Sequence, residues 1–122
     1  MSSKVWTGRV DATEFAPLAS AEGGLTAIEG DPRARVHTFC DGDGLWTGLG
    51  CVEPSKFSYT NDGPGLVQIL EGEATVTADG RSVDLRAGDV VAFPTSVEQT
   101  WEIKSSLREF FVTFASTARP TV

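Results

Sequence analysis

The sequence lacks a long apolar run, and no stretch approaches the roughly 18 apolar residues that a transmembrane helix needs. Its first ten residues mix serine, lysine, threonine and arginine, without the apolar segment of a signal peptide. These two absences predict a cytoplasmic protein with no membrane partner. Basic residues are also few, 10 against 17 acidic ones, and the formal net charge of -7 disfavours binding to nucleic-acid phosphates.

Cysteine and histidine, the side chains that most often bind structural zinc, are scarce. The chain has two cysteines, Cys40 and Cys51, and one histidine, His37. A structural zinc ion takes about four ligands, usually in closely spaced pairs, and these three residues do not form such a set. We therefore expect both thiols to be reduced and buried as small apolar side chains.

Two motifs of common enzyme classes are missing as well. The sequence contains no Gly-x-Ser-x-Gly, which excludes the nucleophile elbow of an α/β-hydrolase. It contains no Gly-x-x-x-x-Gly-Lys loop to hold a phosphate chain. Helical periodicity is absent from Ala34 onward, so the fold must be built from strands.

From Ala34 onward the sequence consists of short β-prone segments separated by turn residues. Asp79-Gly80 is typical of a tight hairpin, and residues 61–65 form a dense turn cluster. Nine strands are predicted, at 35–40, 45–52, 56–60, 66–70, 74–77, 82–85, 90–93, 97–103 and 107–114. This spacing predicts an all-β sandwich or barrel, and a chain of 122 residues suits a single domain.

The first 33 residues are predicted to form an N-terminal arm, and residues 34–122 the barrel. Arms of this kind often cover a sheet edge, either in the same subunit or in a neighbouring one. Asp11 is a plausible helix cap, so one short helical turn is expected between Asp11 and Ala21. Pro17 limits its length.

Two stretches resemble the signature motifs of the cupin superfamily. The first is Gly65–Gly72 (GLVQILEG), and the second is Arg86–Pro94 (RAGDVVAFP). Residues 99–103 (QTWEI) and 107–111 (LREFF) are similar to the small single-domain cupins of the ureidoglycine-aminohydrolase and ethanolamine-utilisation subgroup. The resemblance implies a double-stranded β-helix, the cupin jelly-roll barrel, that pairs as a homodimer. Many members of that subgroup have no assigned function.

The first cupin motif usually supplies two histidines and a glutamate to a metal ion, and all three are absent here. Counted back from the final glycine of the motif, the glutamate position is Gly65. The histidine positions fall at Ser58 and Thr60, or at Tyr59 and Asn61 if the loop is one residue shorter. None of these side chains is a usual ligand of a transition metal.

The histidine of the second motif is replaced by Gln99. A transition metal needs several imidazole, thiolate or carboxylate donors together, and hydroxyls with one amide hold it weakly. The resemblance therefore implies a barrel with no metal and no other cofactor. The opposing interpretation is a site assembled from His37 and scattered acids such as Glu53 or Glu98, although nothing in the sequence brings these together.

The barrel interior is expected to bind a small polar molecule. Alternate residues of each strand face inward, which on the family's register selects Ser58, Thr60, Val67, Ile69, Gln99, Trp101 and Ile103. Ser58, Thr60, Gln99 and Trp101 would offer two hydroxyls, an amide and an indole on apolar walls. Such walls with a few orienting polar groups are typical of small-molecule sites, here for a carboxylate, a sugar or a ureido compound. The structural alternative is that these side chains only fill the core.

Arg108 is the fifth candidate ligand-binding residue, because related small cupins tend to carry a basic residue there. Its guanidinium could hold a ligand carboxylate through two hydrogen bonds. Alternatively, Arg108 could pair with Glu102 or Glu109 across strands, and the sequence favours this pairing.

Two other functions stay open. One is an enzyme, either a metal-dependent hydrolase of the ureidoglycine type or a metal-free sugar isomerase or epimerase. In the isomerase, His37 would act as general base and Tyr59 as general acid, which requires both within reach of one substrate. The other is an accessory dimer whose barrel is filled by its own side chains. The catalytic residues are unknown at this stage.

Overall fold

The computed structural model describes residues 5–18 and 24–114, and every regular element in them is a strand. The strands are β1 (Ala16–Pro17), β2 (Leu25–Glu29), β3 (Arg35–Gly42), β4 (Leu45–Val52), β5 (Ser55–Thr60), β6 (Gly65–Glu71), β7 (Glu73–Ala78), β8 (Arg81–Arg86), β9 (Val90–Phe93), β10 (Glu98–Ile103) and β11 (Leu107–Phe114). No helix long and apolar enough to cross a membrane occurs in these ranges.

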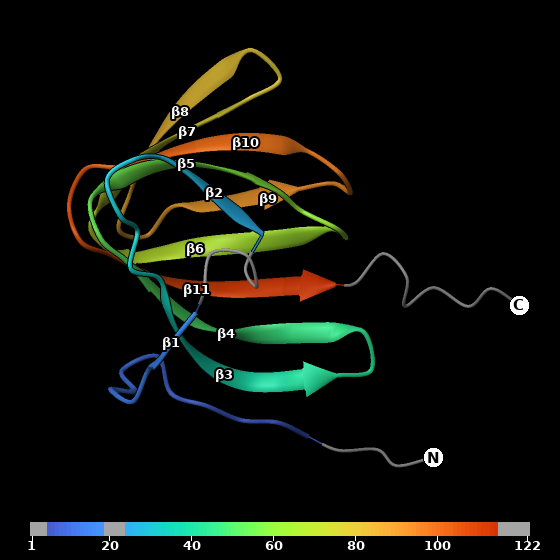
Figure 1. Cartoon of the computed structure of the whole chain (residues 1–122). Helices are drawn as coiled ribbons and strands as arrows, with labels where there is room; N and C mark the ends of the chain where they lie inside the picture. Colours follow the sequence, from blue (N-terminus) through green and yellow to red (C-terminus); the bar gives the residue numbers. More distant parts are fainter. Residues whose placement is uncertain (1–4, 19–23, 115–122) are drawn as a thin grey trace, which may run out of the picture.

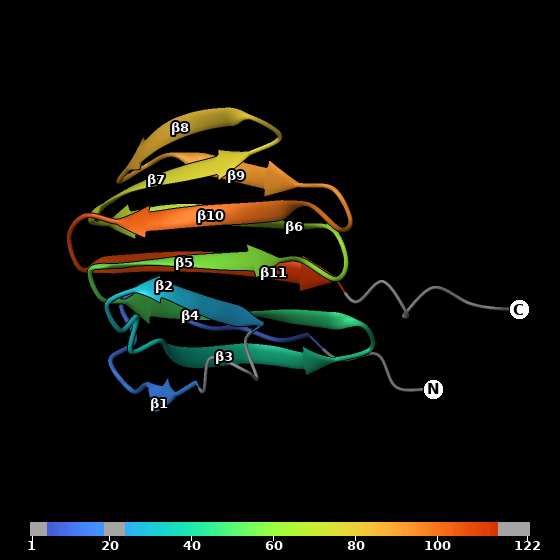
Figure 2. The same ribbon diagram turned by 45° about the horizontal axis from the view of Figure 1, so that its top comes forward.

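The strands form two antiparallel sheets that lie one over the other (Figures 1 and 2). The six-stranded sheet has the order β1-β3-β4-β11-β6-β9, and the five-stranded sheet has the order β2-β5-β10-β7-β8. Strands that are neighbours within a sheet are often distant in sequence, as with β4 and β11. The all-β prediction is confirmed.

All nine predicted strands are present as β3 to β11, with ends shifted by a residue or two. Two further strands, β1 and β2, lie within the segment predicted as an arm. The predicted helical turn is absent from residues 11–18, where the chain makes only a turn closed by Ala12 N–H donating to Arg9 O (3.1 Å). Residues 19–21 of that prediction, with 1–4, 22–23 and 115–122, lie outside the described residues.

The main core lies between the two sheets. Phe57, Trp101 and Val76 stand opposite one another on β5, β10 and β7, and each is at most 5% exposed. Ile69, on β6 of the other sheet, is 0% exposed. Residues opposite each other on antiparallel strands share a face, so these rows supply the apolar surface whose burial drives the sheets together.

A second apolar cluster lies on the outer face of the six-stranded sheet, under residues 5–18. Leu49 is 0% exposed although it faces away from the main core, and in register it stands between His37 and Phe110. The ring of Phe15, from the N-terminal segment, lies 6.0 Å from the imidazole of His37. A Cβ atom at Gly8 would lie 2.2 Å from the Phe39 ring, so this segment passes directly over the sheet.

Candidate ligand-binding cavity

A cavity of about 130 Å³ lies between the two sheets. Its walls are mostly apolar and come from both sheets, with Leu25, Val36, Trp46, Val52, Phe57, Val67, Phe93, Trp101 and Phe111 among the lining residues. A dry cavity of roughly 150 Å³ in another protein holds one benzene molecule. This cavity is therefore of the right size for a ligand of about six non-hydrogen atoms.

A chain of hydrogen bonds joins three side chains in the cavity wall. The indole N–H of Trp101 donates to Gln99 Oε1 (2.8 Å), and Gln99 Nε2 donates to Asn61 Oδ1 (3.0 Å) and to the carbonyl oxygen of Val97 (3.2 Å). Asn61 Nδ2 in turn donates to the carbonyl oxygens of Gly63 (2.8 Å) and Pro94. The amide groups of Gln99 and Asn61 are thus bonded within the protein.

Gln99 and Trp101 face the interior as predicted. Gln99 is 1% exposed and Trp101 is 5% exposed, and both line the cavity. Their polar atoms are bonded to each other and to the neighbouring wall, so they hold the wall together rather than point free groups at the cavity. That either side chain binds a ligand stays a prediction.

The predicted inward orientation of Ser58 and Thr60 is wrong. On β5 the residues opposite Trp101 and Gln99 are Phe57 and Tyr59, so these four side chains share the inner face. Ser58 and Thr60 alternate with them and lie on the outer face of the sheet. The alternative count, with the loop one residue shorter, puts Tyr59 inside, and Tyr59 does line the cavity.

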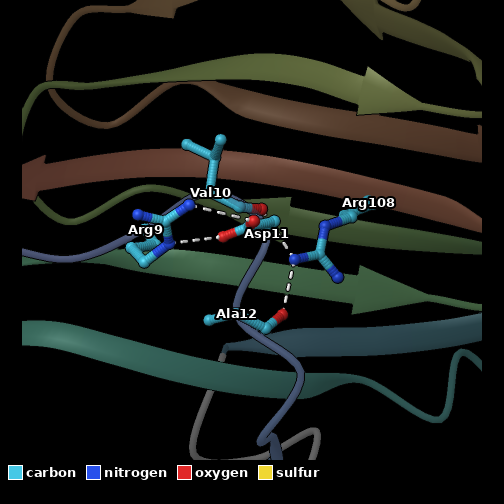
Figure 3. A network of polar contacts seen from close by, with 5 residues as sticks. All are labelled: Arg9, Val10, Asp11, Ala12 and Arg108. Atoms are coloured by element: carbon cyan, nitrogen blue, oxygen red, sulfur yellow. Dashed lines mark hydrogen bonds and ion pairs between the residues drawn. The ribbon is translucent and has the colours of Figure 1, made fainter.

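Arg108 lies on the outer face of the six-stranded sheet and not in the cavity (Figure 3). Its Nη2 donates hydrogen bonds to the carbonyl oxygens of Val10 (2.7 Å) and Ala12 (2.6 Å). Its guanidinium carbon lies 5.2 Å from the centre of the Phe15 ring. No ion pair between Arg108 and Glu102 or Glu109 is present among the described residues, so the favoured pairing is wrong. Arg108 instead fastens the N-terminal segment to the sheet.

Replacing Arg108 with alanine is expected to lower the free energy of unfolding by about 1–3 kcal/mol, because two hydrogen bonds to a charged donor are lost. Limited proteolysis should then cut within residues 5–18 faster than in the wild type. Arg9→Ala is the matched control, since Arg9 forms an exposed pair with Asp11 (3.0 Å) that contributes little. Equal proteolysis of the two variants would contradict the role given to Arg108.

His37 and Tyr59 do not share a site, which argues against the acid–base pair of the isomerase alternative. His37 stands in register with Leu49 on the outer face of the six-stranded sheet. Its Nδ1 is 2.6 Å from the carbonyl oxygen of Glu14, to which it donates a hydrogen bond. Tyr59 lies on the inner face of the other sheet. In the described ranges no three histidine, cysteine or acidic side chains are grouped so that they could hold a metal ion.

Glu109 is the residue that the sequence analysis missed. In register it stands between Gly50 on β4 and Ile69 on β6, on the inner face of β11, and it lines the cavity. A Cβ atom at Gly50 would lie 3.3 Å from its Oε2, so the glycine leaves room for the carboxyl group. Among the described residues this group has no hydrogen-bond or ion-pair partner. Burial raises its pKa to about 7.

Tyr59 is the second uncommitted polar group of the cavity. Its side chain is half-buried, and no described residue forms a hydrogen bond with its hydroxyl. Burial raises the pKa of Tyr59, and the carboxylates of Glu109 and Asp62 raise it further. The hydroxyls of Tyr59 and Thr113 and the carboxyl of Glu109 are therefore available to a ligand.

Comparison with known proteins identifies the fold. A model of the EutQ-like cupin domain matches residues 41–111. An RmlC-like cupin from Shewanella frigidimarina is similar with a TM-score of 0.65 and 17% identity, over 93% of each chain. The EutQ protein of Clostridium difficile is similar with a TM-score of 0.64 and 14% identity, over 82% of this chain and 76% of that one.

A cupin superfamily protein from Desulfitobacterium hafniense is similar with a TM-score of 0.63 and 22% identity, over 73% of this chain and 84% of that one. No protein with curated annotation matches the sequence. At these identities the similar structures show the fold alone, a cupin jelly roll.

Proposed function

Because the chain belongs to the EutQ-like cupin family, we propose that it binds one small molecule between its two sheets, without a resident metal ion. The observation that carries this proposal is the cavity of about 130 Å³. Apolar walls with a few uncommitted polar groups are typical of small-molecule sites. Here those groups include the hydroxyl of Tyr59 and the carboxyl of Glu109.

The side chains at the usual metal-binding positions of a cupin do not fit a metal ion. The oxygen of Gln99 accepts a hydrogen bond from Trp101, and the oxygen of Asn61 accepts one from Gln99. The position of the usual glutamate is Gly65, which has no side chain. A transition metal needs several donors at once, and this set supplies no imidazole, thiolate or carboxylate.

The three ligand classes expected from the sequence are not equally suited to the cavity. A carboxylate ligand would meet the carboxyl of Glu109, so it is the least suited. An accessory role with a filled barrel is the alternative function, and the cavity argues against it.

We also propose that the protein forms a homodimer. Leu66, Val90 and Phe114 share the outer face of the six-stranded sheet and are 36%, 57% and 47% exposed, so a second copy could cover them.

Filling the cavity is the direct test. A panel of small alcohols, amides, ureas, amines and carboxylic acids would be screened by thermal unfolding. We expect at least one compound to raise the melting temperature by several degrees at about ten times its dissociation constant. Val67→Phe places a ring in the cavity and should abolish the shift, whereas Val83→Phe makes the same change at an exposed position and should retain it.

Two results would contradict the proposed function. One is a panel in which no compound raises the melting temperature of the wild type. The other is a shift that persists unchanged in a folded Val67→Phe variant. Treatment with a chelator should leave the shift intact, since the proposed site contains no metal.

A further inference from the structure

We propose that the cavity recognises a small organic cation, an alkylammonium ion of about six non-hydrogen atoms, whose charged nitrogen binds the Glu109 carboxylate within a cage of aromatic rings. This inference rests on the proposed function and adds the chemical class of the ligand.

The cage is the first observation that carries this inference. Six aromatic side chains line the cavity, namely Trp46, Phe57, Tyr59, Phe93, Trp101 and Phe111. They come from both sheets and therefore surround the space. The face of an aromatic ring carries partial negative charge and attracts a cation, and proteins use cages of such rings to recognise alkylated ammonium groups. A merely apolar ligand would be served equally well by aliphatic walls.

The carboxyl group is the second and independent observation. Glu109 is the one acidic side chain among the described lining residues, and no hydrogen bond or ion pair satisfies it there. Glu109 is half-buried, so its carboxylate loses part of its hydration, and a cation in contact with it would offset that loss. A ligand ammonium group would supply the missing partner.

Arg35, the one cation among the described lining residues, is directed elsewhere. Its Nη2 lies 3.7 Å from Glu53 Oε2, and its guanidinium carbon lies 5.7 Å from the centre of the Phe15 ring. Both of these contacts hold it toward the N-terminal segment and the outer face. The Glu109 carboxylate is therefore left for a cation from solution, which the net charge of -7 also attracts.

The ionisation of Glu109 makes the expected binding depend on pH. Burial raises its pKa to about 7, so below that pH an ammonium ion must displace a proton. Among the described lining residues, the titratable group that interacts with Glu109 is Tyr59 from β5, and Arg35 from β3 is directed away from it. Burial, Glu109 and Asp62 together raise the pKa of the Tyr59 hydroxyl, so this hydroxyl stays protonated at neutral pH. The strands that flank Glu109 present Gly50 and Ile69, which do not titrate.

The experiment compares three probes of nearly the same shape: isobutylammonium, isobutanol and isobutyrate. Calorimetry at pH 8 should show the ammonium ion binding at least tenfold more tightly than the alcohol, and no binding of the carboxylate. Glu109→Gln should remove this preference and leave the affinity for isobutanol unchanged. Glu102→Gln, an exposed carboxyl on the other sheet, is the matched control and should retain the preference. The affinity for the ammonium ion should fall up to tenfold per pH unit below 7.

The outcomes separate the two proposals. Should isobutanol bind in the cavity as tightly as isobutylammonium, the inference fails while the proposed function stands. A preference for the ammonium ion that survives Glu109→Gln also overturns the inference. Binding that persists in a folded Val67→Phe variant, or no binding of any probe, overturns both.

Discussion

Glu109→Gln is expected to stabilise the protein at pH 8, by about 1–3 kcal/mol. The unfolded chain ionises this carboxyl near its ordinary pKa, whereas burial raises the pKa to about 7 in the folded state. A raised pKa of an acid means that the folded state holds the proton more tightly. Its contribution to stability is therefore fully present at pH values below the unfolded pKa, and it is lost as the pH rises toward 7. Glutamine does not ionise, so the variant escapes this loss.

Urea unfolding at pH 4, 6 and 8 would measure this effect. The free energy of unfolding of Glu109→Gln should exceed that of the wild type by an amount that grows across this range and levels off above pH 7. The other acidic side chains titrate in the same way in the variant and in the wild type, so their contribution cancels in the difference between the two free energies of unfolding. Glu102→Gln, which removes an exposed carboxyl, should show no such growth. A constant difference between Glu109→Gln and wild type at all three pH values would contradict the raised pKa of the half-buried, unpaired Glu109.

The strands and turns were predictable because their signals are local. Asp79-Gly80 predicted a tight hairpin, and both residues have positive φ angles, 52° and 73°, between the paired strands β7 and β8. Such angles suit the twist of a two-residue hairpin and are readily adopted by these two residues. The spacing of similar signals was sufficient to predict all nine strands from Ala34 onward.

The predicted orientation of β5 is wrong because it depends on the length of the loop between β5 and the motif that ends at Gly72. An error of one residue moves every side chain of a strand to the opposite face. The strand itself held the better signal. Phe57 and Tyr59 alternate with Ser58 and Thr60, and in a half-buried strand the aromatic set faces the core.

Glu109 and Arg108 show a different limit. The sequence suggested that these neighbours pair, but adjacent residues of a strand point to opposite faces. Glu109 shares its face with Leu107 and Phe111, which are both buried, and this signal could have placed it inside. The partners of Arg108, Val10 and Ala12, are 98 and 96 positions away, and no local pattern could have identified them.

Gln99→Ala is expected to destabilise the protein by about 2–4 kcal/mol. The side chain is 1% exposed and bonds Trp101 on one side and Asn61 on the other. Its removal opens a cavity, leaves the buried indole N–H of Trp101 without an acceptor and takes one donor from Asn61. Were Gln99 chiefly a ligand group, its loss would weaken binding and leave the free energy of unfolding almost unchanged.

A double-mutant cycle with Trp101→Phe isolates the contribution of the hydrogen bond between the two side chains. Each single variant loses this bond, so the double variant should be more stable than the sum of the two losses predicts, by about 1–2 kcal/mol. Urea unfolding of the four proteins gives this coupling energy. Because the N–H without an acceptor is absent from the double variant, Trp101→Phe should destabilise Gln99→Ala less than it destabilises the wild type. Strict additivity would show that the bond at 2.8 Å contributes nothing and that the two side chains act only by filling space.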